Sequence, residues 1–261
     1  MSNEFSPRFA YEDSDDEFEK EEELTKFDMP VFKWLKPKDS TTPEEVDLLL
    51  IGNGGGASFL NINVSKNLVG AFLLPEMNIK TNSFDQFSGK SSSCGLYEVG
   101  TTPKTYVLLN SCPTDSQSSI LLSRAILSTI RPKKVIMLDA LDISEYIPPK
   151  SNDVETSKSP IRCLQTSSAS WESKYKTLEI PNIVKNLGGA IMTNCEMRNI
   201  PAALYLTFED KRFKQEGPSS TYAEILEYLM SQSIVPHLPQ CNKSNNPSTH
   251  RNTSSNSTLY L

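Results

Sequence analysis

A run of glycines is the first place where this sequence could do chemistry. Residues 52–57 read GNGGGA, which fits the GxGxxA pattern of dinucleotide-binding loops. In such loops the missing side chains let backbone N–H groups approach a pyrophosphate. Residues 57–63 (ASFLNIN) make a poor continuing helix, so we expect the glycines from Gly52 to Gly56 to form a sharp, closely packed turn. The alternative function for the chain is that of a nucleotide-binding α/β enzyme that uses this loop.

Two carboxylates could do acid–base work. Asp139 and Asp142 follow the apolar segment KKVIML, and open α/β sheets often carry ligand groups at the carboxyl ends of their strands. Such carboxylates more often cap a turn or face water, which is the interpretation we favour. The two histidines, His237 and His250, lie in or next to a polar C-terminal segment. We therefore predict no catalytic residue.

The five cysteines show no metal-binding pattern. They lie tens of residues apart, with no CxxC pair, at Cys94, Cys112, Cys163, Cys195 and Cys241. We therefore predict no metal and no cofactor. An odd number of cysteines and a start without an apolar signal region indicate a reducing compartment, so we expect a cytoplasmic protein, with the nucleus left open as a second location.

The last three residues are a candidate binding site of another kind. Leu259, Tyr260 and Leu261 follow some twenty residues rich in Asn, Ser and Thr. An apolar side chain, a tyrosine ring and a terminal carboxylate can be buried, hydrogen-bonded and paired with a lysine in a slot on a partner. The sequence thus predicts a partner-binding tail on a flexible tether.

The elements that must position these groups follow the pattern of a layered α/β fold. Residues 46–52 (VDLLLIG) are almost continuously apolar, as expected of a strand covered on both faces. Further strands are predicted at 68–74, 96–99, 106–110, 135–138, 161–164 and 203–208. Helices are predicted at 116–130, 182–198 and 221–230. This alternation predicts a largely parallel sheet flanked by helices.

Apolar spacing indicates which helix faces should be buried. Within 116–130, which Asp115 can cap, the residues close to one face are Ile120, Leu121, Ala125, Ile126 and Ile130. Within 221–230 the stripe consists of Tyr222, Ile225, Leu226 and Leu229. We expect both sets to pack on the sheet, and we expect residues 142–160, with three prolines, to form a long surface loop.

Charge is concentrated near the N-terminus. Residues 12–23 (EDSDDEFEKEEE) hold nine acids and one lysine, a net charge of −8. The whole chain carries −6, so the remaining residues together carry +2. A near-neutral body lacks the basic field typical of nucleic-acid partners. We divide the chain into a disordered acidic segment (1–40), one α/β domain (41–238) and a flexible tail (239–261).

One apolar cluster interrupts the acidic segment. Residues 31–35 (VFKWL) could dock on the body or on a partner, although a bare hydrophobic edge of the domain is the interpretation we favour. A generic adaptor that recruits a partner through the acidic segment or the region of Trp34 is a third functional hypothesis. It would place binding at the N-terminus.

Residues 178–210 resemble the proteasome assembly chaperone 1 family. They read LEIPNIVKNLGGAIMTNCEMRNIPAALYLTFED, with PNIV at 181–184, a helix carrying small residues, IPA at 200–202 and LYL at 204–206. Residues 46–60 are similar to the family's first strand and its Gly-Asn turn. The ending Leu259, Tyr260 and Leu261 looks like the hydrophobic-tyrosine-any (HbYX) tail of such chaperones and of proteasome activators. The extra glycines at 54–56 and the loop near 142–160 depart from the family pattern.

The resemblance implies a non-enzymatic chaperone that forms a heterodimer with a related chaperone, proteasome assembly chaperone 2. It also implies binding to the α-subunit ring during assembly of the proteasome core particle. In that role Leu259 fills an apolar slot, Tyr260 packs and hydrogen-bonds at its rim, and the Leu261 carboxylate pairs with a lysine between neighbouring α-subunits. No nucleic-acid partner and no membrane span are expected.

Overall fold

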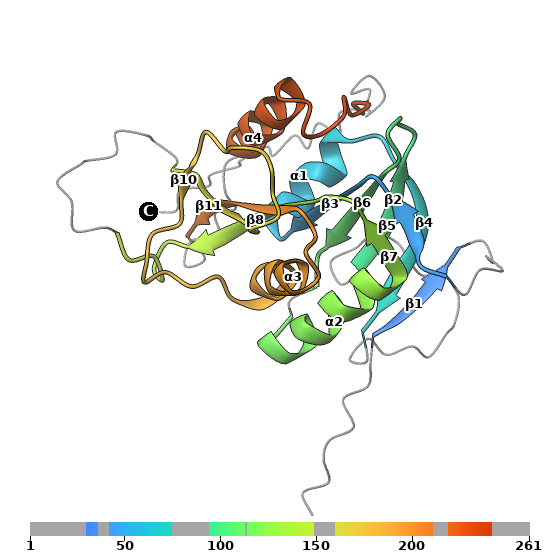
Figure 1. The fold of residues 1–261 in the computed structure, drawn as a ribbon, viewed down its shortest axis with the longest axis horizontal. Helices are drawn as coiled ribbons and strands as arrows, with labels where there is room; N and C mark the ends of the chain where they lie inside the picture. The colour runs from blue at the N-terminus through green and yellow to red at the C-terminus, as the bar shows by residue number, and fades with distance from the viewer. Residues whose placement is uncertain are drawn as a thin grey trace, which may run out of the picture.

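A nine-stranded sheet forms the middle layer of the protein (Figure 1). The computed structural model describes residues 30–35, 42–74, 94–112, 114–148, 160–210 and 219–241. In spatial order the strands are β1 (Val31–Trp34), β4 (Asn67–Leu73), β5 (Cys94–Val99), β6 (Thr105–Asn110), β3 (Leu48–Asn53), β8 (Val135–Asp142), β11 (Ala202–Glu209), β9 (Arg162–Gln165) and β10 (Lys176–Thr177). A separate small sheet pairs β2 (Glu44–Val46) with β7 (Ile130–Pro132).

The centre of this sheet is parallel, as predicted, while most flanking pairs are antiparallel. Strands β6, β3, β8 and β11 pair in parallel. On one side β1, β4, β5 and β6 pair antiparallel in turn, and on the other side β9 runs antiparallel to β11. Residues 100–104 join β5 to β6, and so short a connection can only make a hairpin.

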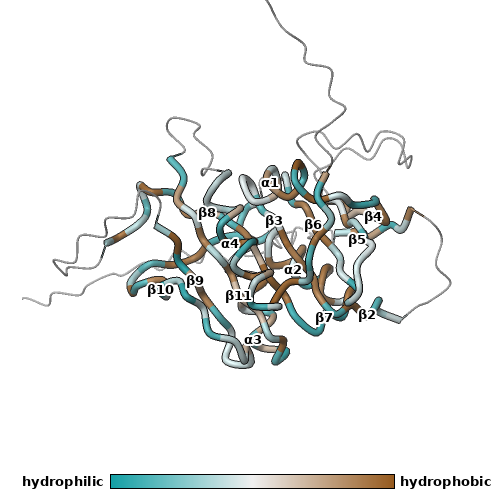
Figure 2. Tube along the Cα trace, turned by 90° about the horizontal axis from the view of Figure 1, so that it is seen from above, coloured by the Kyte–Doolittle hydropathy of each residue, from teal (hydrophilic) through white to brown (hydrophobic). Residues whose placement is uncertain are grey.

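Helices cover both faces of the sheet, which confirms the predicted layered α/β class. Helices α1 (Gly55–Asn63) and α4 (Ser219–Ser231) lie on one face, and α2 (Ser116–Thr129) and α3 (Asn186–Met197) lie on the other (Figure 1). Strand β3 is therefore buried on both sides, which explains its continuous apolar run. Figure 2 shows the hydrophobic residues of β3 and β6 in the interior.

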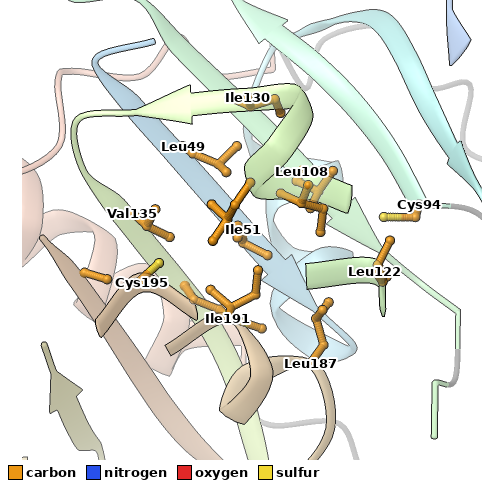
Figure 3. Packing of buried hydrophobic residues seen from close by; sticks show 14 of the residues in the cluster. Leu49, Ile51, Cys94, Leu108, Leu122, Ile130, Val135, Leu187, Ile191 and Cys195 are labelled. Atoms are coloured by element: carbon orange, nitrogen blue, oxygen red, sulfur yellow. The ribbon is translucent and has the colours of Figure 1, made fainter. Parts of the chain in front are cut away.

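Side chains on the two faces of the central strands belong to two separate hydrophobic cores. Side chains alternate along a strand, so Leu49 and Ile51 point to the α2–α3 side while Leu48 and Leu50 point to the α1–α4 side. Figure 3 shows the first core, in which strand residues meet Leu122 of α2 and Leu187, Ile191 and Cys195 of α3. Full burial of each such aliphatic side chain contributes about 1.5–3 kcal/mol of transfer free energy.

Two boundaries differ from the sequence prediction. Residues 31–34 form edge strand β1, where Phe32 packs against Trp34 and Phe72 with ring centroids 4.7 and 4.6 Å apart. The apolar cluster thus docks on the body, because pairing with β4 satisfies its backbone; the rest of 1–40 lies outside the described residues, apart from residue 30. Helix α3 begins at Asn186 and not at 182, because Asn182 closes a turn onto the Glu179 carbonyl (2.9 Å).

Candidate functional site

The predicted binding tail leaves the body beside the end of α1. Leu259, Tyr260 and Leu261 lie outside the described residues, but the start of their tether does not. The Ser65 N–H donates to the Pro239 carbonyl (2.8 Å), and the Cys241 N–H donates to the Asn63 carbonyl (3.2 Å). A β-bridge between Val64 and Gln240 lies between these two bonds. The tether that remains, residues 242–258, therefore starts from the α1–α4 side of the sheet.

The glycine loop joins β3 to α1 and is closely packed. Gly54 has a φ of +52°, in the left-handed region, and α1 begins at the next residue. The prediction that residues 57–63 would not continue as a helix is wrong. A Cβ on Gly56 would overlap the backbone of Leu138 in β8, so this glycine lets α1 approach the sheet. That close packing confirms the structural role we favoured for the loop.

A carboxylate occupies the space at the start of α1 where a phosphate would have to approach. Glu209 Oε1, from the end of β11, lies 2.7 Å from where a Cβ on Gly55 would be, and the Tyr222 hydroxyl lies 3.1 Å from that point. A helix N-terminus favours an anion, and the chain supplies one itself. The geometry therefore disfavours the nucleotide-binding alternative.

The two candidate carboxylates do not form a pair. Both lie on β8 three residues apart, so their side chains point to opposite faces of the sheet. Asp139 Oδ1 accepts hydrogen bonds from Asn53 Nδ2 (2.9 Å) and from the Ala140 N–H (2.8 Å). Asp142 Oδ1 accepts from the N–H and hydroxyl of Ser144 (2.9 and 2.7 Å). Asp142 caps a turn, as we favoured, and Asp139 links β8 to the end of β3.

The cysteines of the body are packing residues. Cys94, Cys112, Cys163 and Cys195 are buried. Burial raises the pKa of the Cys195 thiol to about 12 and that of Cys163 to about 11, so both stay protonated and weakly reactive. Within the described ranges, no three His, Cys, Asp or Glu side chains gather as metal ligands, and no helix is long and apolar enough to cross a membrane.

Helix α2 presents an apolar residue that the sequence placed in the core. Its buried side chains include Ser119, Leu122, Ser123 and Ile126, spaced as one helical stripe. Ile120 lies beside this stripe and is 44% exposed, so the predicted burial of Ile120 is wrong. The serines take the interior positions because α3 packs closely there, and Asn194 of α3 donates to the Ser123 hydroxyl (2.7 Å).

A groove of about 510 Å³ between α2 and α3 collects these exposed apolar residues. Ile120 lies on one wall, and Ile183 and Met197, 71% and 77% exposed, lie on the other. Two cations, Arg124 and Lys185, are among the groove residues, and no acid is. Apolar spacing did not predict this surface, although two apolar residues, Ile183 and Val184, lie close to Pro181 and Lys185 in the sequence.

A buried ion pair holds the segment that carries Ile183. Arg162 Nε donates to both carboxylate oxygens of Glu179 (2.8 and 2.9 Å), and Arg162 Nη2 donates to the Tyr146 hydroxyl (3.0 Å). Tyr146 in turn donates to Glu179 (3.0 Å). Burial opposes ionisation of Glu179, but the hydrogen bonds from Arg162 and Tyr146 outweigh it and keep the pKa of this carboxyl below its ordinary value of 4.5. We call these three residues the Arg162 cluster.

A comparison with protein families identifies the chain. A family model described as "Proteasome assembly chaperone 4" matches residues 45–260. The chain belongs to this family of proteasome assembly chaperones. The match begins within β2, includes the α/β body from β3 to α4 and continues into the C-terminal segment. Assembly chaperones are not an enzyme class, in keeping with a glycine loop and carboxylates that serve the fold.

Individual relatives carry similar names. Proteasome assembly chaperone 1 of Nematostella vectensis is 25% identical over 189 residues, which cover 68% of this chain and 72% of the relative. Proteasome assembly chaperone 1 of Homo sapiens is 24% identical over 199 residues, covering 74% of this chain and 68% of the relative. These relatives support the family resemblance inferred from residues 178–210.

Solved structures share the fold. Pyrococcus furiosus PbaA, described as an archaeal homolog of proteasome-assembly chaperone, superposes with a TM-score of 0.51 at 12% identity over 79% of this chain and 83% of its own. A Corynebacterium glutamicum protein of unknown function gives a TM-score of 0.51 at 10% identity, covering 81% of this chain and 84% of its own. At such low identities these likenesses show the fold alone.

Proposed function

We propose that this chaperone forms a heterodimer with a related chaperone, proteasome assembly chaperone 2, and binds the α-subunit ring to promote assembly of the proteasome core particle. The observation that carries the proposal is the family match, which spans residues 45–260 and so includes both the folded body and Tyr260. The relatives named above are proteasome assembly chaperones, which supports the same role. We propose a cytoplasmic location and leave the nucleus open.

In this proposal the tail makes three distinct contacts with the ring. Leu259 is buried in an apolar slot between two α-subunits, Tyr260 packs at its rim with its hydroxyl hydrogen-bonded, and the Leu261 carboxylate pairs with a lysine. The side chain of Leu261 contributes least, because its carboxylate makes the contact. So short a segment binds weakly alone, and docking of the body raises its effective concentration to the order of millimolar.

The point at which the tail is attached to α1 limits the positions that Leu259, Tyr260 and Leu261 can reach. Its last described residue, Cys241, is hydrogen-bonded to Asn63, and 17 residues separate it from Leu259. A polar flexible chain of that length spans on the order of 23 Å (~5–6 Å × √17). The ring would therefore lie on the α1–α4 side of the body, and a tail in its slot would exclude activators that use the same slot.

A binding assay with matched tail variants tests the proposal. The full chain, co-expressed with the related chaperone, is used to pull down proteasome α-subunits. Deletion of residues 259–261 and Tyr260→Ala should each weaken binding by about tenfold or more, since Tyr is a frequent hot-spot residue. Leu261→Ala is the control, because it keeps the carboxylate, and its affinity should stay within about threefold.

Three results would argue against parts of this proposal. Equal binding by all variants would assign ring recognition to the body and remove the tail from it. A tail-deleted chaperone that still excludes activators would contradict competition for the slot. If no version binds α-subunits, the ring-binding role is wrong, and calorimetry with nucleotides would retest the loop at residues 52–56.

A further inference from the structure

We propose that the α2–α3 face is the docking surface for the second chaperone, whose facing surface is apolar at its centre and acidic at its rim. We define this face by Ile120, Ile147, Ile180, Ile183 and Met197. Each is at least 44% exposed, and together they make up most of the large exposed apolar side chains of the described part of the chain. The inference rests on the heterodimer proposed above and assigns it a surface.

The amount of apolar surface exposed here points to a protein partner. Ile180 is 96% exposed and Ile183 is 71% exposed, although both lie in an ordered segment next to a helix. Ile120, Ile183 and Met197 line one groove, and exposed apolar side chains gathered in this way on a folded protein are typical of an interaction site. The groove between α2 and α3, about 510 Å³, could accept a side chain or helix edge of the partner at the centre of the contact.

The face is held in place before any partner binds. The Asn182 side chain accepts from the Ile147 N–H and donates to the Ile147 carbonyl (2.8 Å each), which ties the two isoleucine-bearing turns together. The Arg162 cluster fixes the same two turns to β9. Gly189 lets the segment lie close on α3, because an added Cβ would be 2.5 Å from the Val184 carbonyl oxygen. A surface ordered in advance loses less conformational entropy on association.

Charge argues for a different subunit and against a second copy of this chain. The groove residues include the cations Arg124 and Lys185 and no acid. Lys185 is paired with Glu145 of its own chain (3.1 Å), while Arg124 extends from an exposed position of α2. A two-fold contact centred on the groove would bring the Arg124 side chains of the two copies together, and like charges at an interface oppose association. A partner with acids at its rim would be attracted.

Two other occupants fit the surface less well. The acidic residues 12–23 of the same chain match the charge, but they contain a single large apolar side chain, Phe18, and cannot cover five exposed positions. The α-subunit ring would have to reach the tail as well, and the tail leaves from the opposite side of the sheet, at Cys241. The two sides of the sheet thus suit two different partners.

The test measures pairing with the co-expressed related chaperone, using full-length chains. The double variant Ile183→Glu with Met197→Glu should weaken pairing by about 30-fold or more, the loss expected for a hot spot worth about 2 kcal/mol. Ile62→Glu is the matched control, because Ile62 is 64% exposed on α1, on the other side of the sheet. Pairing of this control should stay within about twofold.

A second variant covers the case in which the double substitution unfolds the chain. Arg124→Glu changes an exposed rim residue and should slow association and reduce its dependence on salt, as for electrostatic steering. If the wild-type chain does not pair at all, both the heterodimer and this inference are wrong. If it pairs and neither the double variant nor Arg124→Glu changes pairing, the inference alone is wrong. It is equally wrong if these variants reduce only α-subunit binding, or only self-association.

Discussion

Each face of the sheet is covered by two helices, but the two faces differ in how many apolar side chains stay exposed. On the α1–α4 side the predicted stripe of α4 is fully used, since Tyr222, Ile225, Leu226 and Leu229 are all buried. On the α2–α3 side two helices pack on an equally apolar sheet, yet Ile120, Ile183 and Met197 stay exposed. The first side completes the fold and holds the start of the tail, and the second is completed by a partner in our proposal.

This difference separates stability from association. Substitutions of the buried apolar residues on the α1–α4 side should change the free energy of unfolding, because these residues already have their contacts within the chain. Substitutions of exposed residues on the α2–α3 face should change pairing and leave the unpaired chain almost unaffected. The following variants test that separation, beginning with the largest expected change in stability.

Gly56→Ala should be the most destabilising change. The new Cβ would overlap the Leu138 carbonyl oxygen, a backbone atom that cannot rotate away. We expect a loss of about 3 kcal/mol in the free energy of unfolding, more than the ~1 kcal/mol that alanine adds in helix propensity. Urea unfolding measures it, with Gly100→Ala as the control because a Cβ there meets nothing within 4 Å. Equal midpoints for the two variants would show that α1 does not need this close contact.

Arg162→Leu should destabilise the chain by about 2–3 kcal/mol. The arginine side chain is 3% exposed, and its removal leaves the Glu179 carboxylate, 20% exposed, with little compensation. Unlike Gly56→Ala, this change should also weaken pairing, because the Arg162 cluster holds the turns that carry Ile147 and Ile183. Unfolding in urea and the pairing assay measure the two effects. Loss of stability with unchanged pairing would mean that those turns do not form the docking surface.

The Glu179 carboxylate predicts how the α2–α3 side responds to acid. Its pKa is lower in the folded chain than the ordinary 4.5, so its contribution to stability is complete above that value and disappears as the pH falls through the lower, folded pKa. Glu179→Gln should therefore be less stable than wild type at neutral pH, and the difference should vanish in acid. Unfolding midpoints measured across this range test it; a constant difference would show that the pKa of Glu179 is the same in the folded and the unfolded chain.

Lys66→Met should have a smaller effect, on the α1–α4 side. The Lys66 ammonium donates to the carbonyls of Leu60, Asn61 and Val64 (3.2, 2.9 and 3.1 Å), which closes the C-terminal end of α1. Methionine keeps the apolar stem and loses these bonds, at a cost of about 1 kcal/mol. Thermal unfolding measures the change. A stabilised variant would indicate that burial of the ammonium costs more than its hydrogen bonds return.

Sequence periodicity predicted what depends on local contacts. Strand β3 and the stripe of α4 were predicted correctly because an apolar pattern alone specifies them. Helix α1 was missed because packing on β8 overrides the poor helix propensity of residues 57–63, and β1 was missed because it pairs with a strand 36 or more residues away. A pairing of Asp139 with Asp142 was considered because the strand was expected to end at residue 138, whereas β8 continues to Asp142.

The tail residues Leu259, Tyr260 and Leu261 could be proposed from the sequence, whereas the α2–α3 face could not. A terminal motif is defined by residues that are adjacent in the chain. The exposed face combines residues from α2, from the turn at Ile147, from the segment before α3 and from the C-terminal end of α3, and only the fold brings them together. The position of Ile120 in the sequence indicates that it lies near the core-facing stripe of α2. It does not indicate that α3 leaves this side chain exposed.

The smallest expected change in stability is also the sharpest test of the comparison. Ile183→Ala removes a large apolar side chain that is 71% exposed, so the free energy of unfolding of the unpaired chain should stay within about 0.5 kcal/mol of wild type. Ile191→Ala makes the same substitution at a fully buried position of α3, where a cavity should cost about 3 kcal/mol. If Ile183→Ala destabilises the unpaired chain as much as Ile191→Ala, the exposed isoleucines serve the fold of the single chain. The α2–α3 face would then be complete without a partner.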